Sequence, residues 1–180
     1  MSAVFSQGFE SDSTGFSTPA DSNAFVRTTD QAYTGLNSFF GSGEDLANPY
    51  RTEFSVTLAG PGQLTYWHRS SSAMATAGHT LRINGAIEHT RTTTQQQNWT
   101  QETVSLPAGT HTIQFESHRE LDNASEDGVW IDDVIVTETS PSEVAITLAN
   151  VPNIIVHARR SNGGRIYNQA TGEASAIVNV

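Results

Sequence analysis

Alternation of apolar and polar residues at every second position is the feature that most constrains how this chain folds. Phe54, Val56 and Leu58 share one face of residues 53–58, and the same period returns at 64–69, 81–84 and 113–118. Turn-forming sequences separate these segments, such as Ala-Gly-Pro-Gly at 59–62 and Asn-Gly at 84–85. No segment shows a convincing helical period. Short strands at this spacing predict an all-β fold, a jelly-roll β-sandwich of two antiparallel sheets.

The domain organisation follows from length and from one boundary signal. A chain of 180 residues is long enough for one sandwich core and a small appendage. Ser-Pro-Ser at 140–142 predicts a boundary between a sandwich domain at 1–140 and a β-rich C-terminal extension or docking arm at 141–180. We expect strands in the extension at residues 144–148, 153–158 and 174–180. A piece this small buries little core, so it either adds strands to the sandwich or docks on another subunit.

Composition excludes several kinds of partner and site. The chain has no Cys, which rules out disulfides, thiol catalysis and thiolate metal sites. A net charge of −10 argues against nucleic acid as a partner, since phosphate binding needs clustered cations. No apolar run approaches the roughly 20 residues of a membrane span, so we expect no membrane insertion. All nine basic residues are Arg, which suits carboxylate, sugar or interface contacts, although nucleotide composition bias explains the pattern equally well.

Two adjacent carboxylates interrupt an otherwise apolar strand. The sequence Val-Trp-Ile-Asp-Asp-Val-Ile-Val at 129–136 sets Asp132 and Asp133 in its middle. A buried strand tolerates such groups only when a cation or hydrogen-bond donors compensate them. Glu10, in Gly-Phe-Glu-Ser-Asp at 8–12, is positioned to share a cation if the first and last strands lie together. Structural Ca²⁺ is one interpretation; the other is that Asp132 accepts main-chain hydrogen bonds or meets an Arg, while Glu10 is solvated.

At these residues the chain resembles the calcium-containing β-jelly-roll modules found as carbohydrate-binding modules and as related adhesin or MAM-like domains. The resemblance spans residues 5–138 and includes Ala-Tyr-Thr-Gly-Leu-Asn-Ser at 32–38, like an early strand, and Leu-Pro-Ala-Gly at 106–109, like a late hairpin. It implies a calcium site with side-chain oxygens from Glu10 and Asp132, a carbonyl near Gly35, and Asp133 as a weaker candidate. The motifs are short, so they indicate a superfamily and no particular ligand.

Carbohydrate binding needs an aromatic platform beside planar hydrogen-bonding groups. Polar and aromatic residues of two segments lie opposite the aliphatic faces of their strands: Trp67, Arg69, Gln114, Glu116 and His118. If those strands are neighbours, the residues form one surface, with Trp99 at its flank. The alternative places Trp67 in the core and Tyr66 outside, since Trp is mostly buried. The six His residues show no metal-binding spacing, and we expect them on the surface.

Catalysis finds no support in the sequence. There is no G-x-S-x-G elbow, no H-E-x-x-H helix motif, no Gly-rich phosphate loop and no Cys nucleophile. Asp132 and Asp133 point to opposite faces of a strand, so they cannot flank one glycosidic bond. The sequence predicts a non-enzymatic protein.

The predicted role is a virion surface protein of a bacteriophage, either a capsid decoration protein or a tail or fibre adhesin. Residues 1–8 lack the basic and apolar regions of a signal peptide, which favours a cytoplasmic product held in an assembly. Arg159, Arg160 and Arg165 would then dock the extension on other subunits of that assembly. The alternative is a carbohydrate-binding module of a bacterial secreted enzyme or adhesin, located outside the cell or on its surface. A third interpretation is an assembly domain without any ligand.

Overall fold

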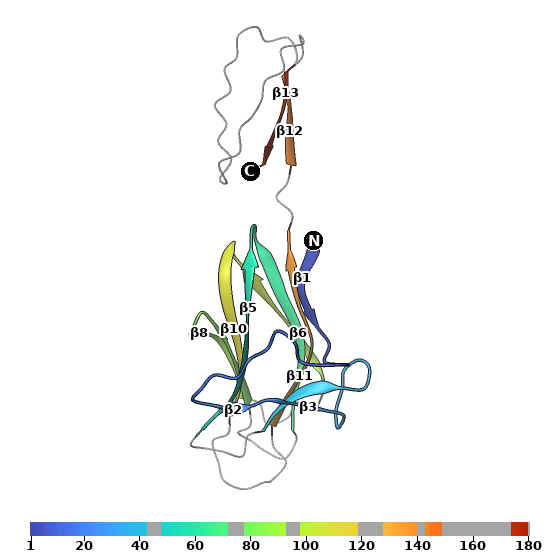
Figure 1. The fold of residues 1–180 in the computed structure, drawn as a ribbon, viewed down its shortest axis with the longest axis vertical. Coiled ribbons are helices and arrows are strands. Elements are labelled where there is room, and N and C mark those ends of the chain that lie inside the picture. The colour runs from blue at the N-terminus through green and yellow to red at the C-terminus, as the bar shows by residue number, and fades with distance from the viewer. Residues whose placement is uncertain are drawn as a thin grey trace. The chain divides into compact units, whose positions relative to one another are not determined.

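The computed structural model describes residues 1–42, 48–71, 78–92, 98–118, 128–139, 143–148 and 174–179. The chain divides into two compact units, Met1–Thr139 and Ser140–Val180. Two β-sheets face each other in the first unit, and β-strands are the only regular elements among the described residues (Figure 1). The predicted all-β jelly-roll sandwich is confirmed.

The first sheet has the strand order β3-β4-β11-β6-β9, and β1 also pairs with β11. All of its pairs are antiparallel. Its strands are β1 (Ser2–Gln7), β3 (Val26–Thr28), β4 (Ser38–Ser42), β6 (Gly62–Ser70), β9 (Thr100–Leu106) and β11 (Gly128–Glu138).

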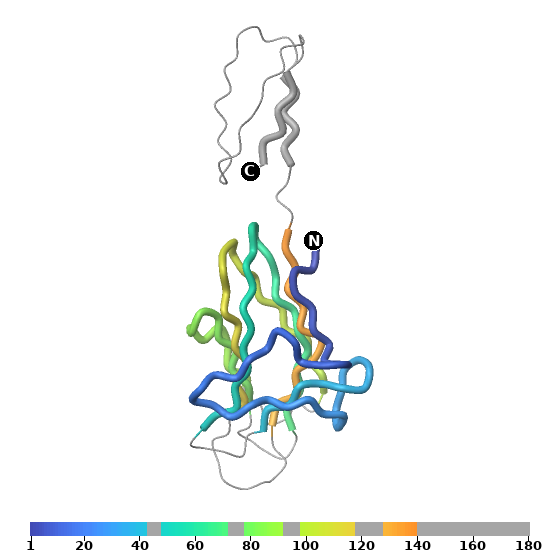
Figure 2. Tube along the Cα trace, viewed as in Figure 1, coloured from blue at the N-terminus to red at the C-terminus, as the bar shows by residue number. Residues whose placement is uncertain are grey.

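The second sheet has the order β2-β5-β10-β7-β8, and only the short β2 pairs in parallel. Its strands are β2 (Asn23–Ala24), β5 (Tyr50–Leu58), β7 (Gly78–Ile83), β8 (Ala86–Thr92) and β10 (Gly109–His118). After β1 the chain therefore crosses to the second sheet at β2 and returns to the first at β3, a path that Figure 2 shows in blue.

The core fills the space between the inner faces of the two sheets. Strand β5 buries every second side chain from Thr52 to Leu58, as its alternation predicts. Phenylalanine rings dominate one region of this core, with Phe9 stacked on Phe39 at a centroid distance of 4.9 Å and Phe5 on Phe54 at 4.2 Å. Burial of these large rings is the main source of stability that a chain without disulfides has available.

One edge of β11 changes its partner halfway along the strand. Residues 128–131 pair with β4, and residues 134–138 pair with β1. On the other edge, the register with β6 shifts between Asp132 and Ile135. Asp133 takes a positive φ of 45° at this irregularity. The two carboxylates predicted from the sequence thus lie where β1, β4 and β11 meet.

In the second unit, β12 (Glu143–Leu148) and β13 (Ala174–Asn179) pair antiparallel with each other. Two of the three strands expected in the extension are thereby found. The third expected strand, at 153–158, and the predicted docking residues Arg159, Arg160 and Arg165 lie outside the described residues. In the part of the chain that the structure describes, no helix has the length and apolarity needed to cross a membrane.

Candidate functional site

Asp132 holds a loop to the junction in β11. Its side chain is fully buried. Oδ2 accepts hydrogen bonds from the main-chain N–H groups of Tyr33 and Thr34 at 2.9 and 3.2 Å, and Oδ1 accepts one from Asp133 at 2.8 Å. Burial raises the pKa of Asp132 to about 6, against the lowering effect of these hydrogen bonds. Main-chain donors therefore compensate the burial of this carboxylate in part.

Glu10 holds the other end of the same loop. Its carboxylate accepts hydrogen bonds from the main-chain N–H groups of Leu36 and Asn37, at distances of 3.0 and 3.1 Å. These two bonds are the main reason that the pKa of Glu10 is lowered. Gly35 directly precedes Leu36 with a φ of 65°, and a Cβ at this position would overlap the Glu10 carboxyl group. Only glycine meets both requirements without strain.

Asp133 adds a third attachment. The Thr34 hydroxyl lies 3.0 Å from each of its carboxylate oxygens. We name Glu10, Asp132 and Asp133 the carboxylate clasp, and residues 31–37 the clasp loop. This loop was expected to be part of an early strand, but β4 begins only at Ser38, because the amides of the loop donate to side chains instead of a neighbouring strand.

The clasp suits Ca²⁺ in the chemistry of its donors, because calcium prefers carboxylate and carbonyl oxygens. Among the described residues, none of its three carboxylates forms an ion pair. Their oxygens, however, point to N–H and O–H groups of the clasp loop. Within the described ranges, no three His, Cys, Asp or Glu side chains lie close enough together to hold a metal ion. The calcium site stays a prediction.

An aromatic patch lies directly beside the clasp, on the outer face of the first sheet. Trp67 of β6 is the register partner of Asp132, and it points outward because Tyr66 and His68 on either side of it are buried. Tyr33 of the clasp loop stacks on Trp67, with ring centroids 3.7 Å apart and an interplanar angle of 15°. Trp99 meets Tyr33 edge-on at 6.0 Å. We name Tyr33, Trp67 and Trp99 the aromatic patch.

A second group of aromatic residues lies next to the patch on the same face, but its rings are covered by their neighbours. Trp130 packs on Phe40 at 4.8 Å between centroids, and the Arg69 guanidinium lies 5.8 Å from the Trp130 ring. Trp130 is only 9% exposed, so it offers little surface to a ligand. Arg69 donates a hydrogen bond of 2.6 Å to Oε1 of Gln31, which ties this row to the clasp loop.

The single surface expected from Trp67, Arg69, Gln114, Glu116 and His118 does not form. Trp67 and Arg69 belong to β6 of the first sheet, whereas Gln114 and Glu116 belong to β10 of the second. The outer faces of the two sheets point in opposite directions, because their inner faces enclose the core. The side chain of His118 lies outside the described residues. Trp99 does flank Trp67, as predicted, through its contact with Tyr33.

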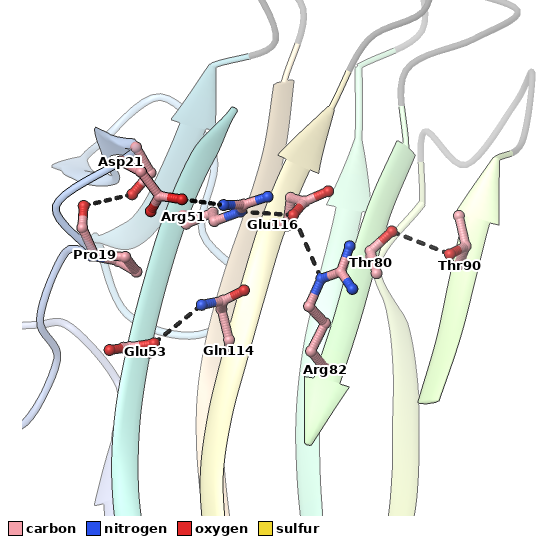
Figure 3. Close-up of polar contacts among 10 residues, drawn as sticks. Pro19, Asp21, Arg51, Glu53, Thr80, Arg82, Thr90, Gln114 and Glu116 are labelled. Carbon is pink, nitrogen blue, oxygen red and sulfur yellow. Dashed lines mark hydrogen bonds and ion pairs between the residues drawn. The ribbon is translucent and has the colours of Figure 1, made fainter. Parts of the chain in front are cut away.

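On the second sheet, Glu116 belongs to a polar network that is already paired (Figure 3). Its Oε2 lies 2.7 Å from Nε of Arg51 and 3.5 Å from Nε of Arg82, and Arg51 also contacts Asp21. Gln114 donates a hydrogen bond of 3.0 Å to Glu53 one row along. These pairs link β5, β10 and β7 across their outer face, and they therefore stabilise the second sheet.

Three of the histidines expected on the surface are buried: His68, His79 and His111. His68 and His79 belong to a polar cluster between the sheets, where the Tyr66 hydroxyl lies 2.9 Å from Nε2 of His79 and 2.8 Å from Nε2 of His89. Burial lowers the pKa of His68 to about 4. The burial of His68 could be predicted from the sequence, because His68 follows Leu64 and Tyr66 at every second position and therefore shares their inward face of β6.

Tyr33 is the residue of the patch that sequence reasoning missed. It lies in an irregular loop, where no periodicity assigns it to a face. Its ring partner Trp67 is distant in sequence, and the clasp that brings them together depends on the partner change in β11. No local signal could have identified this contact.

Neither a protein-family model nor a curated protein matches this sequence. Solved structures do. The K1 cleaved adhesin domain of Lys-gingipain from Porphyromonas gingivalis W83 is similar with a TM-score of 0.60 and 18% identity, over 75% of this chain and 98% of that one. The CBM22-1 xylan-binding domain of Paenibacillus barcinonensis Xyn10C matches with a TM-score of 0.53 and 16% identity, over 74% of this chain and 92% of that one. TmCBM61, solved with β-1,4-galactotriose, has a TM-score of 0.53 and 18% identity, over 72% of this chain and 93% of that one.

The first unit has the jelly-roll fold of these carbohydrate-binding modules and this adhesin domain. At these identities the likeness concerns the fold, so any function must be argued from the residues of this chain. The resemblance seen in the sequence to carbohydrate-binding modules and adhesin domains is confirmed at the level of the fold. The virion surface role expected from the sequence has no counterpart among the three structures named above.

Proposed function

We propose that this protein is a non-enzymatic carbohydrate-binding module that binds a polysaccharide through its aromatic patch, outside the cell or on a cell surface. The observation that carries the proposal is the grouping of Tyr33, Trp67 and Trp99 on the outer face of the first sheet. Aromatic rings offer a flat apolar surface with a negative face, which suits the C–H groups on one side of a sugar ring. Similarity to xylan- and galactotriose-binding modules supports this choice over a virion role.

Tyr33 is the ring that a sugar would contact. It covers one face of Trp67 and is itself 39% exposed, so Trp67 supports the platform from below. In this arrangement Trp67 supports the Tyr33 ring, whereas the sequence predicted that Trp67 contacts the sugar directly. Gln101, exposed on β9 as the register partner of Trp67, and Gln31 of the clasp loop supply hydrogen-bonding groups beside the rings.

A structural calcium ion also belongs to this proposal. The side chains of Glu10 and Asp132 would hold it, with Asp133 and the carbonyl of Gly35 as further candidates. The ion would supply positive charge to three carboxylates that form no ion pair within the described residues.

Binding to a panel of soluble polysaccharides, including xylan and β-1,4-galactan, tests the proposal by affinity electrophoresis and calorimetry. We expect Tyr33→Ala and Trp99→Ala each to weaken binding at least tenfold, because each removes a contact ring. Ile87→Ala is the matched control, since Ile87 is 57% exposed on the second sheet. Full binding by a Tyr33/Trp99 double variant would place the site elsewhere. Absence of binding to the whole panel would favour the interpretation as an assembly domain.

A further inference from the structure

The clasp loop is held largely through its main chain. Four of its N–H groups, those of Tyr33, Thr34, Leu36 and Asn37, donate to just two carboxylates. Two side chains of the loop add to this attachment: the Thr34 hydroxyl contacts Asp133, and the Tyr33 ring stacks on Trp67. Tyr33, Thr34 and Leu36 are nevertheless exposed. The position of the loop therefore depends on a few carboxylate oxygens and one ring contact.

The position of Tyr33 is fixed at two points that are neighbours in the sheet. Its N–H group binds Asp132 on β11, and its ring stacks on Trp67 on β6. Asp132 and Trp67 are register partners across these two strands. The carboxylate that fixes the main chain of Tyr33 therefore lies beside the ring that receives its side chain.

We propose that Glu10, Asp132 and Asp133 are positioning residues that set the place of the Tyr33 ring, and thereby the affinity of the aromatic patch for a saccharide. The part concerning affinity rests on the function proposed above. A ring already held in its binding position loses less conformational entropy when a ligand binds. The clasp contributes by holding that ring in advance, without touching the ligand.

Two substitutions in the loop test this role while leaving the buried Asp132 in place. Gly35→Ala introduces a Cβ that overlaps the Glu10 carboxyl group at a positive φ, so the loop and that carboxylate must separate and their hydrogen bonds are disturbed. Gly85→Ala is its matched control, because Gly85 also has a positive φ, of 82°, but has no neighbour within 4 Å of an added Cβ. Thr34→Val removes the hydroxyl that donates to Asp133, and Thr34→Ser restores it.

The readout is the chemical shift of the Tyr33 ring protons by NMR, which depends on the ring current of Trp67. It is measured beside thermal stability and polysaccharide affinity. We expect Gly35→Ala to move these resonances and to weaken binding roughly tenfold, as expected for lost preorganisation. Thr34→Val should act in the same direction, while Thr34→Ser and Gly85→Ala should retain the native shifts and affinity.

A merely structural clasp would lower the melting temperature and leave the Tyr33 resonances in place. Unchanged resonances in both Gly35→Ala and Thr34→Val would therefore overturn the positioning role. A displaced ring with undiminished affinity would overturn the link to binding. If the native chain binds no polysaccharide, the proposed function fails, and the NMR measurement still decides whether the clasp positions Tyr33.

Discussion

Tyr33 and Trp67 stack at 3.7 Å between centroids with a 15° angle between their rings. This is closer than the usual 4.5–7 Å between aromatic centroids. One ring comes from an irregular loop and the other from the middle of β6, so the contact joins the loop to the sheet. Because of this contact, the partly exposed Trp67 ring supports the exposed Tyr33 ring.

Trp67→Ala should release the Tyr33 ring and lower the free energy of unfolding by about 2 kcal/mol, because the variant loses both a half-buried ring and a stacking partner. Chemical denaturation measures the loss of stability, and near-UV circular dichroism reports the environment of the remaining aromatic rings. Ile87→Ala serves as the control, since it removes an exposed side chain from the other sheet. If the near-UV spectrum of Trp67→Ala lacks only the contribution of one tryptophan, and the signals of the other rings are unchanged, the stacking of Tyr33 on Trp67 is contradicted.

The architecture could be predicted from the sequence because it depends on local signals. Alternation over residues 53–58 and 64–69, together with the turn at 59–62, corresponds directly to β5, β6 and the connection by which the chain passes from the second sheet to the first. The assignment of strands to sheets depends on pairing between distant segments, which alternation does not encode. For that reason the sequence could not decide whether β6 and β10 are neighbours, and the structure places them in different sheets.

The candidate site was predictable only in part. Glu10, Gly35 and Asp132 were expected to lie together, and the clasp loop does bring Gly35 against Glu10 and Tyr33 against Asp132. The sequence left open whether a cation or main-chain donors compensate Asp132, and it does not reveal which amides donate, since every residue except proline carries that donor. The aromatic patch was incomplete for the same reason, because the clasp is what places Tyr33 there.

Phe9→Ala should cost about 3–5 kcal/mol of stability, in the range for removing a fully buried aromatic ring. Phe9 is completely buried, and its ring stacks on Phe39. It also directly precedes Glu10 of the clasp, so its loss should loosen the first strand's connection to the clasp loop. Denaturant unfolding measures the cost. Val4→Ala, at an exposed position of β1, should change stability by less than about 0.5 kcal/mol.

His68 should make the fold sensitive to acid. Its pKa is about 4 in the folded protein because burial disfavours the cation, compared with 6.5 for an exposed histidine. Below pH 6.5 His68 binds a proton in the unfolded chain but not in the folded protein. The free energy of unfolding therefore keeps its full value above pH 6.5 and declines as the pH falls toward 4. The difference corresponds to about 3 kcal/mol.

The groups facing His68 oppose one another. Glu102 lies 3.6 Å from its Nε2, but the same carboxylate binds Arg91 through two hydrogen bonds of 2.8 and 3.0 Å. His79 lies beside His68 with ring centroids 4.2 Å apart, and the positive charges of His89 and Arg91 lower the pKa of His68 further. We expect His68→Leu to flatten the decline between pH 6.5 and 4, measured by urea unfolding at each pH. Equal slopes for the variant and the native protein would show that His68 stays accessible to protons.

Calcium should raise the melting temperature if the clasp holds it. An ion that binds only the folded state stabilises it by about 2.7 kcal/mol at a free concentration one hundred times its Kd. Differential scanning calorimetry with calcium and with EGTA measures this difference, and elemental analysis checks for bound metal. Glu10→Gln should abolish the calcium effect and leave the EGTA value near that of the native protein. Identical melting temperatures in the two buffers, with no bound calcium, would remove the ion from the proposal.

A chain that ends at Thr139 should fold as well as the full chain, because all strands of both sandwich sheets and the whole aromatic core lie within Met1–Thr139. Its melting temperature and polysaccharide affinity should therefore equal those of the full chain. Light scattering after size exclusion then tests the predicted docking role of Arg159, Arg160 and Arg165. That role requires an oligomer that dissociates on truncation or on substitution of the three arginines by Ala. Monomers in every case would contradict the docking role and leave the sandwich to act as a separate binding unit, since the residues named for the proposed site all lie within Met1–Thr139.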